Sequence, residues 1–254
     1  MPRSAGVLMH ITSLPSPWGA GTLGEEAFRF VDFLQAAGQT WWQILPVGPT
    51  GYGASPYQSY SAFAGNPYLI DPGLLCQEGL LTPDEPAEVD WGKDAALVDF
   101  DKLEQGRMKL LRLAWGRARQ NHKIVTAIEA FCQNEKDWLE DYALFMALKG
   151  RFGGAPWHEW PDEPLRLHKE TGFWKFTQFM FFRQWKALKQ YANSRGVRLL
   201  GDMPIYVAAD SADAWSRPEL FWLDRQRRPV CVAGCPQDDF SETGQLWGNP
   251  LYDW

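Results

Sequence analysis

The sequence lacks an excess of positive charge. Its 25 lysines and arginines are outnumbered by 31 aspartates and glutamates, which gives a formal net charge of −6. Proteins that hold a nucleic-acid backbone usually carry a basic excess or patch, so we expect no nucleic-acid partner. No apolar run approaches the length that spans a membrane, and we expect no membrane partner either.

Cysteine is also scarce, and the first residues show no pattern of a cleaved secretion signal. The four cysteines are scattered, and Cys231 and Cys235 lack the close pairing of a zinc ribbon or a redox motif. We therefore expect reduced thiols, no metal site and a cytoplasmic protein.

Apolar and aromatic side chains are abundant. The 254 residues are 45% hydrophobic and include 14 tryptophans, which suits one large domain or two small ones with a substantial core. Indole marks either a large core or a carbohydrate-binding surface. Composition does not choose between them, but we expect most of the tryptophans in the core.

The first 45 residues predict a strand, a helix and a second strand. Residues 6–11 and 40–45 are apolar runs typical of strands buried on both faces of a parallel sheet. Between them, apolar residues recur on one side of residues 25–37, and Gly38 suits the position after a helix. Such a βαβ unit is right-handed and pairs its strands in parallel.

Three glycines between the first strand and this helix spell the dinucleotide-binding pattern G-x-G-x-x-G, namely Gly19, Gly21 and Gly24. The pattern begins too far after the strand, and Glu25 and Glu26 would repel a pyrophosphate. The next strand also ends without the acidic residue that holds a ribose. We interpret the segment as a glycine-rich connector.

A long loop, residues 45–71, follows the second strand and carries no charge before Asp71. It is dense in glycine, proline, hydroxyl groups and aromatic rings, and is too apolar for a solvated linker. Aromatic faces beside amide and hydroxyl groups suit a sugar, whose ring face stacks while its polar edge forms hydrogen bonds. The candidate contacts are Tyr52, Tyr57, Gln58 and Tyr60.

The middle of the chain predicts helices over residues 105–121 and 173–194, and a third that starts at Asn134 as its cap and runs to Lys149. In the first of these we expect an apolar side and a solvated basic face, which includes Arg107, Lys109, Arg112, Arg117 and Arg119.

The last 60 residues predict a third strand and a second functional loop. Residues 197–207 form an apolar run in which Asp202 is a lone carboxylate, so it must be hydrogen-bonded or lie at the strand's C-terminal end. A structural buried aspartate is the alternative to a site role. We expect Ser211 to cap a short turn, and residues 233–250 to form a loop whose Phe240, Leu246 and Trp247 are buried.

Several of these segments resemble the amylomaltases, the 4-alpha-glucanotransferases of bacteria and plants. The likeness rests chiefly on Gly-Pro-Thr-Gly-Tyr-Gly-x-Ser-Pro-Tyr-Gln-Ser at residues 48–59, with the segments at 8–15, 173–178, 201–207 and 240–250. The resemblance implies a (β/α)8 barrel with a large helical insertion. It also implies transfer of α-1,4-glucan segments between maltooligosaccharides with retention of configuration, and no cofactor.

The resemblance further implies the residues that bind the glucan. Ser55 and Tyr57 would line the donor site, Tyr52 would belong to an outer glucan-contact patch, and Asp202 would bind a sugar hydroxyl. Gln245 and Trp247 would sit on a lid that folds over the glucan and excludes water.

The family's nucleophile segment, Arg-x-Asp-His-Phe-Arg-Gly, does not occur here, and retaining chemistry needs two carboxyls about 5 Å apart. We therefore expect the catalytic residues beyond Trp254 and the chain to be an N-terminal half. The fold would be α/β, with the first three strands of a TIM barrel. Residues 1–72 would hold two barrel βα units, 73–195 a helical insertion, and 196–254 the third strand and the lid.

Alternative functions stay open at this stage. The chain could be a catalytically inactive fragment that acts as a glucan-binding or interaction module. A starch hydrolase is another alternative, and its chemistry is close to that of a glucanotransferase. A nucleotide-dependent oxidoreductase is a third, but only the glycine pattern supports it.

Overall fold

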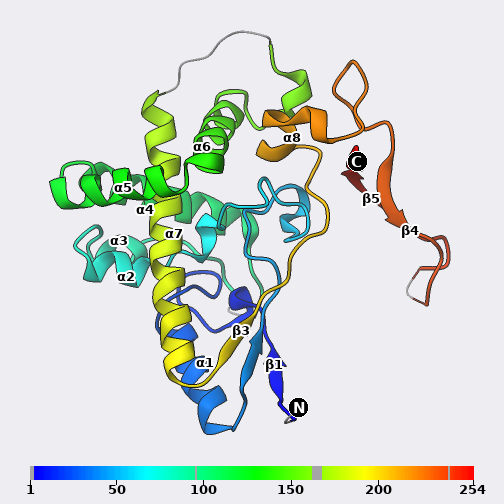
Figure 1. Cartoon of the computed structure of the whole chain (residues 1–254). Helices are drawn as coiled ribbons and strands as arrows, with labels where there is room; N and C mark the ends of the chain where they lie inside the picture. The colour runs from blue at the N-terminus through cyan, green and yellow to red at the C-terminus, as the bar shows by residue number, and fades with distance from the viewer. Residues whose placement is uncertain (1–2, 95, 162–167, 240) are drawn as a thin grey trace. The chain divides into compact units, whose positions relative to one another are not determined.

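The computed structural model describes residues 3–94, 96–161, 168–239 and 241–254, apart from the side chains of Tyr52, His168 and Lys169. The chain divides into two compact units. Unit 1 comprises residues 1–47, 65–134 and 175–203, and unit 2 comprises 48–64, 135–174 and 204–254. Figure 1 shows the elements of both units.

Unit 1 contains a parallel sheet of three strands in the order β1 (Gly6–Leu8), β2 (Trp41–Gln43) and β3 (Arg198–Leu200). Val7 lies opposite Trp42, which lies opposite Leu199. The prediction of a parallel βαβ unit is confirmed. Each strand pairs over only three residues and is therefore shorter than the apolar run that predicted it.

Helices cover one face of this sheet (Figure 1). Helix α1 (Glu25–Ala36) packs Phe30 against the fully buried Trp42, with ring centroids 5.0 Å apart. It also contacts α7 (His168–Ser194), whose Tyr191 hydroxyl donates to Asp32 at 2.6 Å. The prediction that the strands are buried on both faces is wrong for the described residues, because Leu8 and Leu200 are 57% and 46% exposed.

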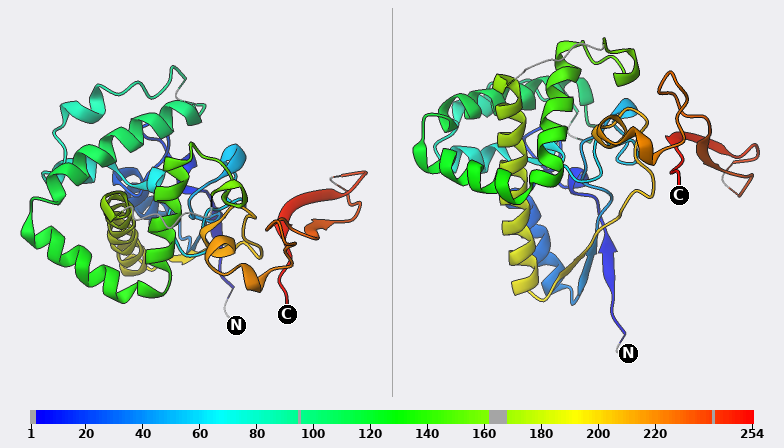
Figure 2. Two further views of the ribbon diagram at one scale, coloured as in Figure 1. Left: turned by 90° about the horizontal axis from the view of Figure 1, so that it is seen from above. Right: turned by 45° about the horizontal axis from the view of Figure 1, so that its top comes forward.

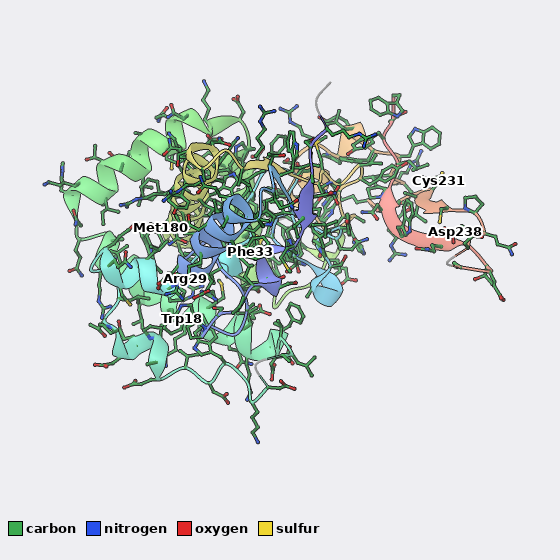
Figure 3. All side chains as sticks on the ribbon, turned by 90° about the horizontal axis from the view of Figure 1, so that it is seen from below. Trp18, Arg29, Phe33, Met180, Cys231 and Asp238 are labelled. Atoms are coloured by element: carbon green, nitrogen blue, oxygen red, sulfur yellow. The ribbon has the colours of Figure 1, made fainter. Side chains whose placement is uncertain are left out.

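Helix α1 confirms the sequence prediction to within one residue. Ala27, Val31 and Leu34 form its buried stripe, whereas Arg29 and the exposed Phe33 lie on the outer side (Figure 3). Gly38 follows the helix with φ +69°, a conformation that glycine adopts without strain.

The remaining helices of unit 1 differ from the prediction in number. They are α2 (Pro72–Gln77), α3 (Asp84–Ala87), α4 (Phe100–Ala118) and α5 (His122–Asn134), besides the part of α7 from residue 175 on. Asn134 ends α5 and does not cap the next helix, so that prediction is wrong.

Arg107 also departs from the prediction, because it is fully buried in α4 and not part of a solvated face. Its guanidinium donates to the carbonyl oxygens of Ile70 and Trp18 and lies 5.2 Å from the centre of the Trp91 ring. Burial lowers the pKa of Arg107 to about 10. A buried cation is tolerated here because carbonyl groups and an aromatic face replace its water.

Unit 2 has a core of large rings and small side chains around α6 (Lys136–Arg151) and α8 (Ala212–Ser216). Tyr142 and Phe145 of α6 are fully buried there, with Trp157 and Trp160. Ser211 caps α8 as predicted, accepting a hydrogen bond from the Ala214 N–H at 3.2 Å.

Four of the 14 tryptophans are buried, fewer than expected: Trp42, Trp157, Trp160 and Trp174.

The predicted C-terminal loop contains a hairpin, in which β4 (Val232–Cys235) pairs antiparallel with β5 (Gln245–Pro250). Figure 2 shows it extending beyond α8, and Figure 3 shows Cys231 and Asp238 on it. The expected burial of Leu246 and Trp247 is wrong, since they are 84% and 44% exposed. Phe240 lies outside the described residues.

None of the helices in the described part of the chain is long and apolar enough to cross a membrane.

Candidate functional site

The aromatic loop at residues 48–64 is folded back on itself inside unit 2. The Gly51 N–H donates to the Gln58 carbonyl at 2.7 Å, and the Tyr60 N–H donates to the Pro49 carbonyl at 3.0 Å. Glycine is required at two points: Gly53 has φ +69°, and a side chain at Gly51 would lie 2.8 Å from the Gln58 carbonyl oxygen. The loop is therefore an ordered structure with its own hydrogen bonds.

This loop forms one wall of a cavity of about 760 Å³ within unit 2. Other walls come from the end of α6 and the residues after it, from the segment before α8, and from β5. The lining residues are Gly51, Gly53, Ser55, Gln58, Tyr60, Lys149, Gly154, Pro156, Ala208, Ala209, Asp210, Trp247 and Gly248. The volume lies within the range of sites that hold small ligands.

Four of the predicted contact residues, Ser55, Gln58, Tyr60 and Trp247, line this cavity, although Trp247 is far from the other three in sequence. Gln58 links their segments, since its amide nitrogen donates to the Trp247 carbonyl at 2.8 Å and to the Asn249 side chain at 3.0 Å. Asn249 in turn donates to the Val207 carbonyl at 2.8 Å. Gln58 thus fixes the aromatic loop against β5.

Tyr57, Gln245 and Asp202 are not among the residues that line the cavity. Tyr57 is 45% exposed, and the Gln245 side chain accepts a hydrogen bond from the Trp247 indole at 3.1 Å. The side chain of Tyr52 lies outside the described residues. Asp202 belongs to unit 1, where it follows the C-terminal end of β3, as its sequence context predicts.

The cavity also contains an ion pair that the sequence prediction missed, between Lys149 of α6 and Asp210. The Lys149 side chain is only 7% exposed, and its ammonium group lies 5.2 Å from the centre of the Tyr60 ring. The sequence does not indicate that Lys149 is buried, because the nearby basic residue Arg151 is exposed. The acidic partner of Lys149 is also 61 residues away in the chain.

A second cavity of unit 2, of about 350 Å³, is lined by both apolar and charged side chains. Phe63 and Trp138 stack beside it with ring centroids 6.3 Å apart. Asp213 lines it and accepts a hydrogen bond from the Ala62 N–H at 3.0 Å. Burial raises the pKa of Asp213, because removing water disfavours the charged carboxylate.

The described residues contain no cluster of three or more histidine, cysteine, aspartate or glutamate side chains that could hold a metal ion. The larger cavity instead presents aromatic rings, a hydroxyl, an amide and a carboxylate. Aromatic faces beside hydroxyl, amide and carboxylate groups suit a polar ligand with ring faces.

Comparison with known proteins identifies the family. The model of the 4-alpha-glucanotransferase family matches residues 9–254. The chain is 50% identical to a 4-alpha-glucanotransferase of Thermus thermophilus over all of its length and 48% identical to one of Clostridium butyricum over 97% of it. An amylomaltase from Streptococcus agalactiae, solved in complex with acarbose, superposes over the whole chain with a TM-score of 0.96 at 45% identity. The chain belongs to the 4-alpha-glucanotransferase family.

The chain spans about half the length of these relatives, 53% of each of the two enzymes and 54% of the amylomaltase structure.

Proposed function

We propose that this chain supplies the glucan-binding pocket of a 4-alpha-glucanotransferase. The enzyme would transfer α-1,4-glucan segments between maltooligosaccharides or starch-type glucans with retention of configuration. The observation that carries the proposal is that Ser55 and Trp247 line one cavity in a chain of this family. Trp247 and Tyr60 would stack on glucose rings, while Ser55 and Gln58 would form hydrogen bonds to hydroxyl groups.

The remaining predicted contacts form part of the same proposal. Tyr57 would stack against a glucose of the donor, Asp202 would bind a sugar hydroxyl, Gln245 would act with Trp247 as a lid, and Tyr52 would belong to an outer contact patch. The exposure of Tyr57 and the position of Asp202 after a parallel strand are compatible with these roles.

We also propose that the three parallel strands are part of a (β/α)8 barrel. The exposed sheet face, with Leu8 and Leu200, supports this, because apolar strand surfaces normally pack against other elements. The proposed division is residues 1–72 and 196–254 as barrel segments with the lid, and 73–195 as the insertion. A cytoplasmic location stays a prediction.

The catalytic carboxylates would come from outside these 254 residues, since the family's nucleophile segment is absent from the sequence. Retaining transfer needs one carboxylate as nucleophile and another as acid and base, about 5 Å apart. The residues described above would hold the donor glucan and exclude water, which favours transfer to a second sugar over hydrolysis.

A fusion protein tests this function. The chain is joined to the part of the Thermus thermophilus relative that it does not cover, and maltotriose products are separated by size. We expect the fusion to form a ladder of longer maltooligosaccharides and the chain alone to leave maltotriose unchanged. A folded fusion that only hydrolyses maltotriose, or leaves it unchanged, would contradict the proposal. Glucan binding without transfer would favour a binding module instead.

A further inference from the structure

We propose that Asp210 accepts hydrogen bonds from glucan hydroxyl groups in the larger cavity, and that Lys149 is the positioning residue that holds its carboxylate there. This inference rests on the proposed function and assigns two residues of the same pocket.

Lys149 is placed to orient other groups rather than to bind a ligand itself. An ammonium group has three hydrogen-bond donors. Here they are directed to the Gly154 carbonyl at 2.8 Å, the Ala155 carbonyl at 3.2 Å and Oδ2 of Asp210. Because every donor has an acceptor within the protein, none remains for a sugar. The cation instead connects the residues after α6 with the segment before α8.

Asp210 has the remaining capacity to bind. Its Oδ2 accepts from Lys149 and its Oδ1 accepts from the Trp157 N–H at 3.2 Å. Each carboxylate oxygen can accept two hydrogen bonds, so each retains one unused position. The side chain is 30% exposed and lines the cavity. A carboxylate is an acceptor only, and sugar hydroxyl groups are the donors that complement it.

The backbone on both sides of Asp210 is fixed. The Trp157 indole donates to the Ala209 carbonyl at 2.8 Å, and Ser211 is fully buried as the cap of α8. A carboxylate held in this way loses little conformational freedom when a ligand binds, so each hydrogen bond contributes more to affinity. Tyr60 and Trp247 line the same cavity and supply the ring faces that a carboxylate lacks.

The alternative is that the buried ion pair only stabilises the fold, because removing one partner of such a pair generally leaves an uncompensated charge. Comparing K149M with K149M/D210N separates a role of Asp210 in binding from a role in stability, because both variants lack the ion pair. K149M removes the cation and leaves Asp210 with the Trp157 N–H and water. Adding D210N to K149M then removes the carboxylate without breaking an ion pair.

Calorimetric titration with maltoheptaose provides the measurement, with thermal unfolding to show that each variant is folded. We expect K149M to weaken binding a few-fold, and K149M/D210N to weaken it a further tenfold or more, about the value of a hydrogen bond to a charged group. Equal affinity of K149M and K149M/D210N would overturn the inference. If K149M does not fold, D210E serves, because it keeps the charge but displaces the carboxylate; unchanged affinity of D210E would overturn the inference too.

The control is R117M/E85Q, which removes an ion pair of unit 1 that lines neither cavity described above. We expect it to leave affinity unchanged, and an equal loss in this variant would contradict a specific role for Asp210. A folded wild-type chain without saturable binding would contradict the proposed function as well. Wild-type binding with an unaffected K149M/D210N variant overturns only the inference.

Discussion

At the scale of single residues, the pair of Glu85 and Arg117 links stability to pH. The Arg117 guanidinium donates to both carboxylate oxygens of Glu85, and the Thr82 N–H donates to one of them. The bond from Arg117 is the largest cause that lowers the pKa of Glu85 from its ordinary 4.5 to about 2. The unfolded chain therefore takes up a proton at higher pH than the folded chain.

The predicted result is that Glu85 contributes stability above pH 4.5 and loses it progressively as the pH falls toward 2. Urea unfolding at about pH 5, 4 and 3 measures this in the wild type and in E85Q. The free energy of unfolding should fall less steeply with decreasing pH in E85Q, because glutamine does not titrate. Identical slopes would show that Glu85 is not a source of the acid sensitivity.

The site residues show which local signals the sequence carries. Ser55 and Trp247 could be predicted because each stands in a recognisable segment, and the structure brings both to one cavity. Lys149 and Asp210 could not, because nothing near either residue in the sequence records a partner 61 positions away. Arg107 was missed for the same reason, since its acceptors belong to Ile70 and Trp18.

At the scale of elements, the glycines before α1 have a steric role. A side chain at Gly21 would overlap the carbonyl oxygen of Ile11, and Gly19 has φ +80°. These contacts explain the glycine-rich spacing without a nucleotide, in agreement with the interpretation of the segment as a connector.

G21A should therefore lower the free energy of unfolding by about 1–3 kcal/mol, the usual cost of overpacking a site that cannot relax. G116A is the matched control, because Gly116 lies in α4 and a methyl group added there would meet no atom within 4 Å outside the helix's own backbone. It should raise stability by about 0.5–1 kcal/mol through helix propensity. Chemical denaturation measures both, and a neutral G21A would contradict the steric account.

The elements that could be predicted are those whose local pattern and tertiary packing agree. Helix α1 has a clear apolar stripe and a glycine after it, and the strands before and after it are short apolar runs.

Helix α5 was missed because residues 124–128 are rich in β-branched side chains, which lower helix propensity, and only Ile128 of that helix is buried. The β4–β5 hairpin was missed because its glycines resemble a loop, whereas Gly234 allows the close approach of the Gln245 carbonyl.

At the scale of the whole molecule, the parallel sheet and the larger cavity belong to different units. Unit 1 holds the parallel sheet, with a face whose exposed Leu8 and Leu200 support a larger sheet. Unit 2 holds the larger cavity complete, since all of its lining residues belong to that unit. The lining of the larger cavity therefore does not depend on how the two units are placed, whereas the contact proposed for Asp202 belongs to unit 1.

The most direct test is calorimetric titration of the folded chain with maltoheptaose, in the wild type, W247A and L246A. Trp247 lines the cavity, whereas the neighbouring Leu246 is 84% exposed and does not. We predict saturable binding to the wild type and to L246A. W247A should bind about five- to thirtyfold more weakly, as expected for the loss of about 1–2 kcal/mol of apolar contact. No saturable heat with the wild type, or equal affinity of W247A and L246A, would contradict the account.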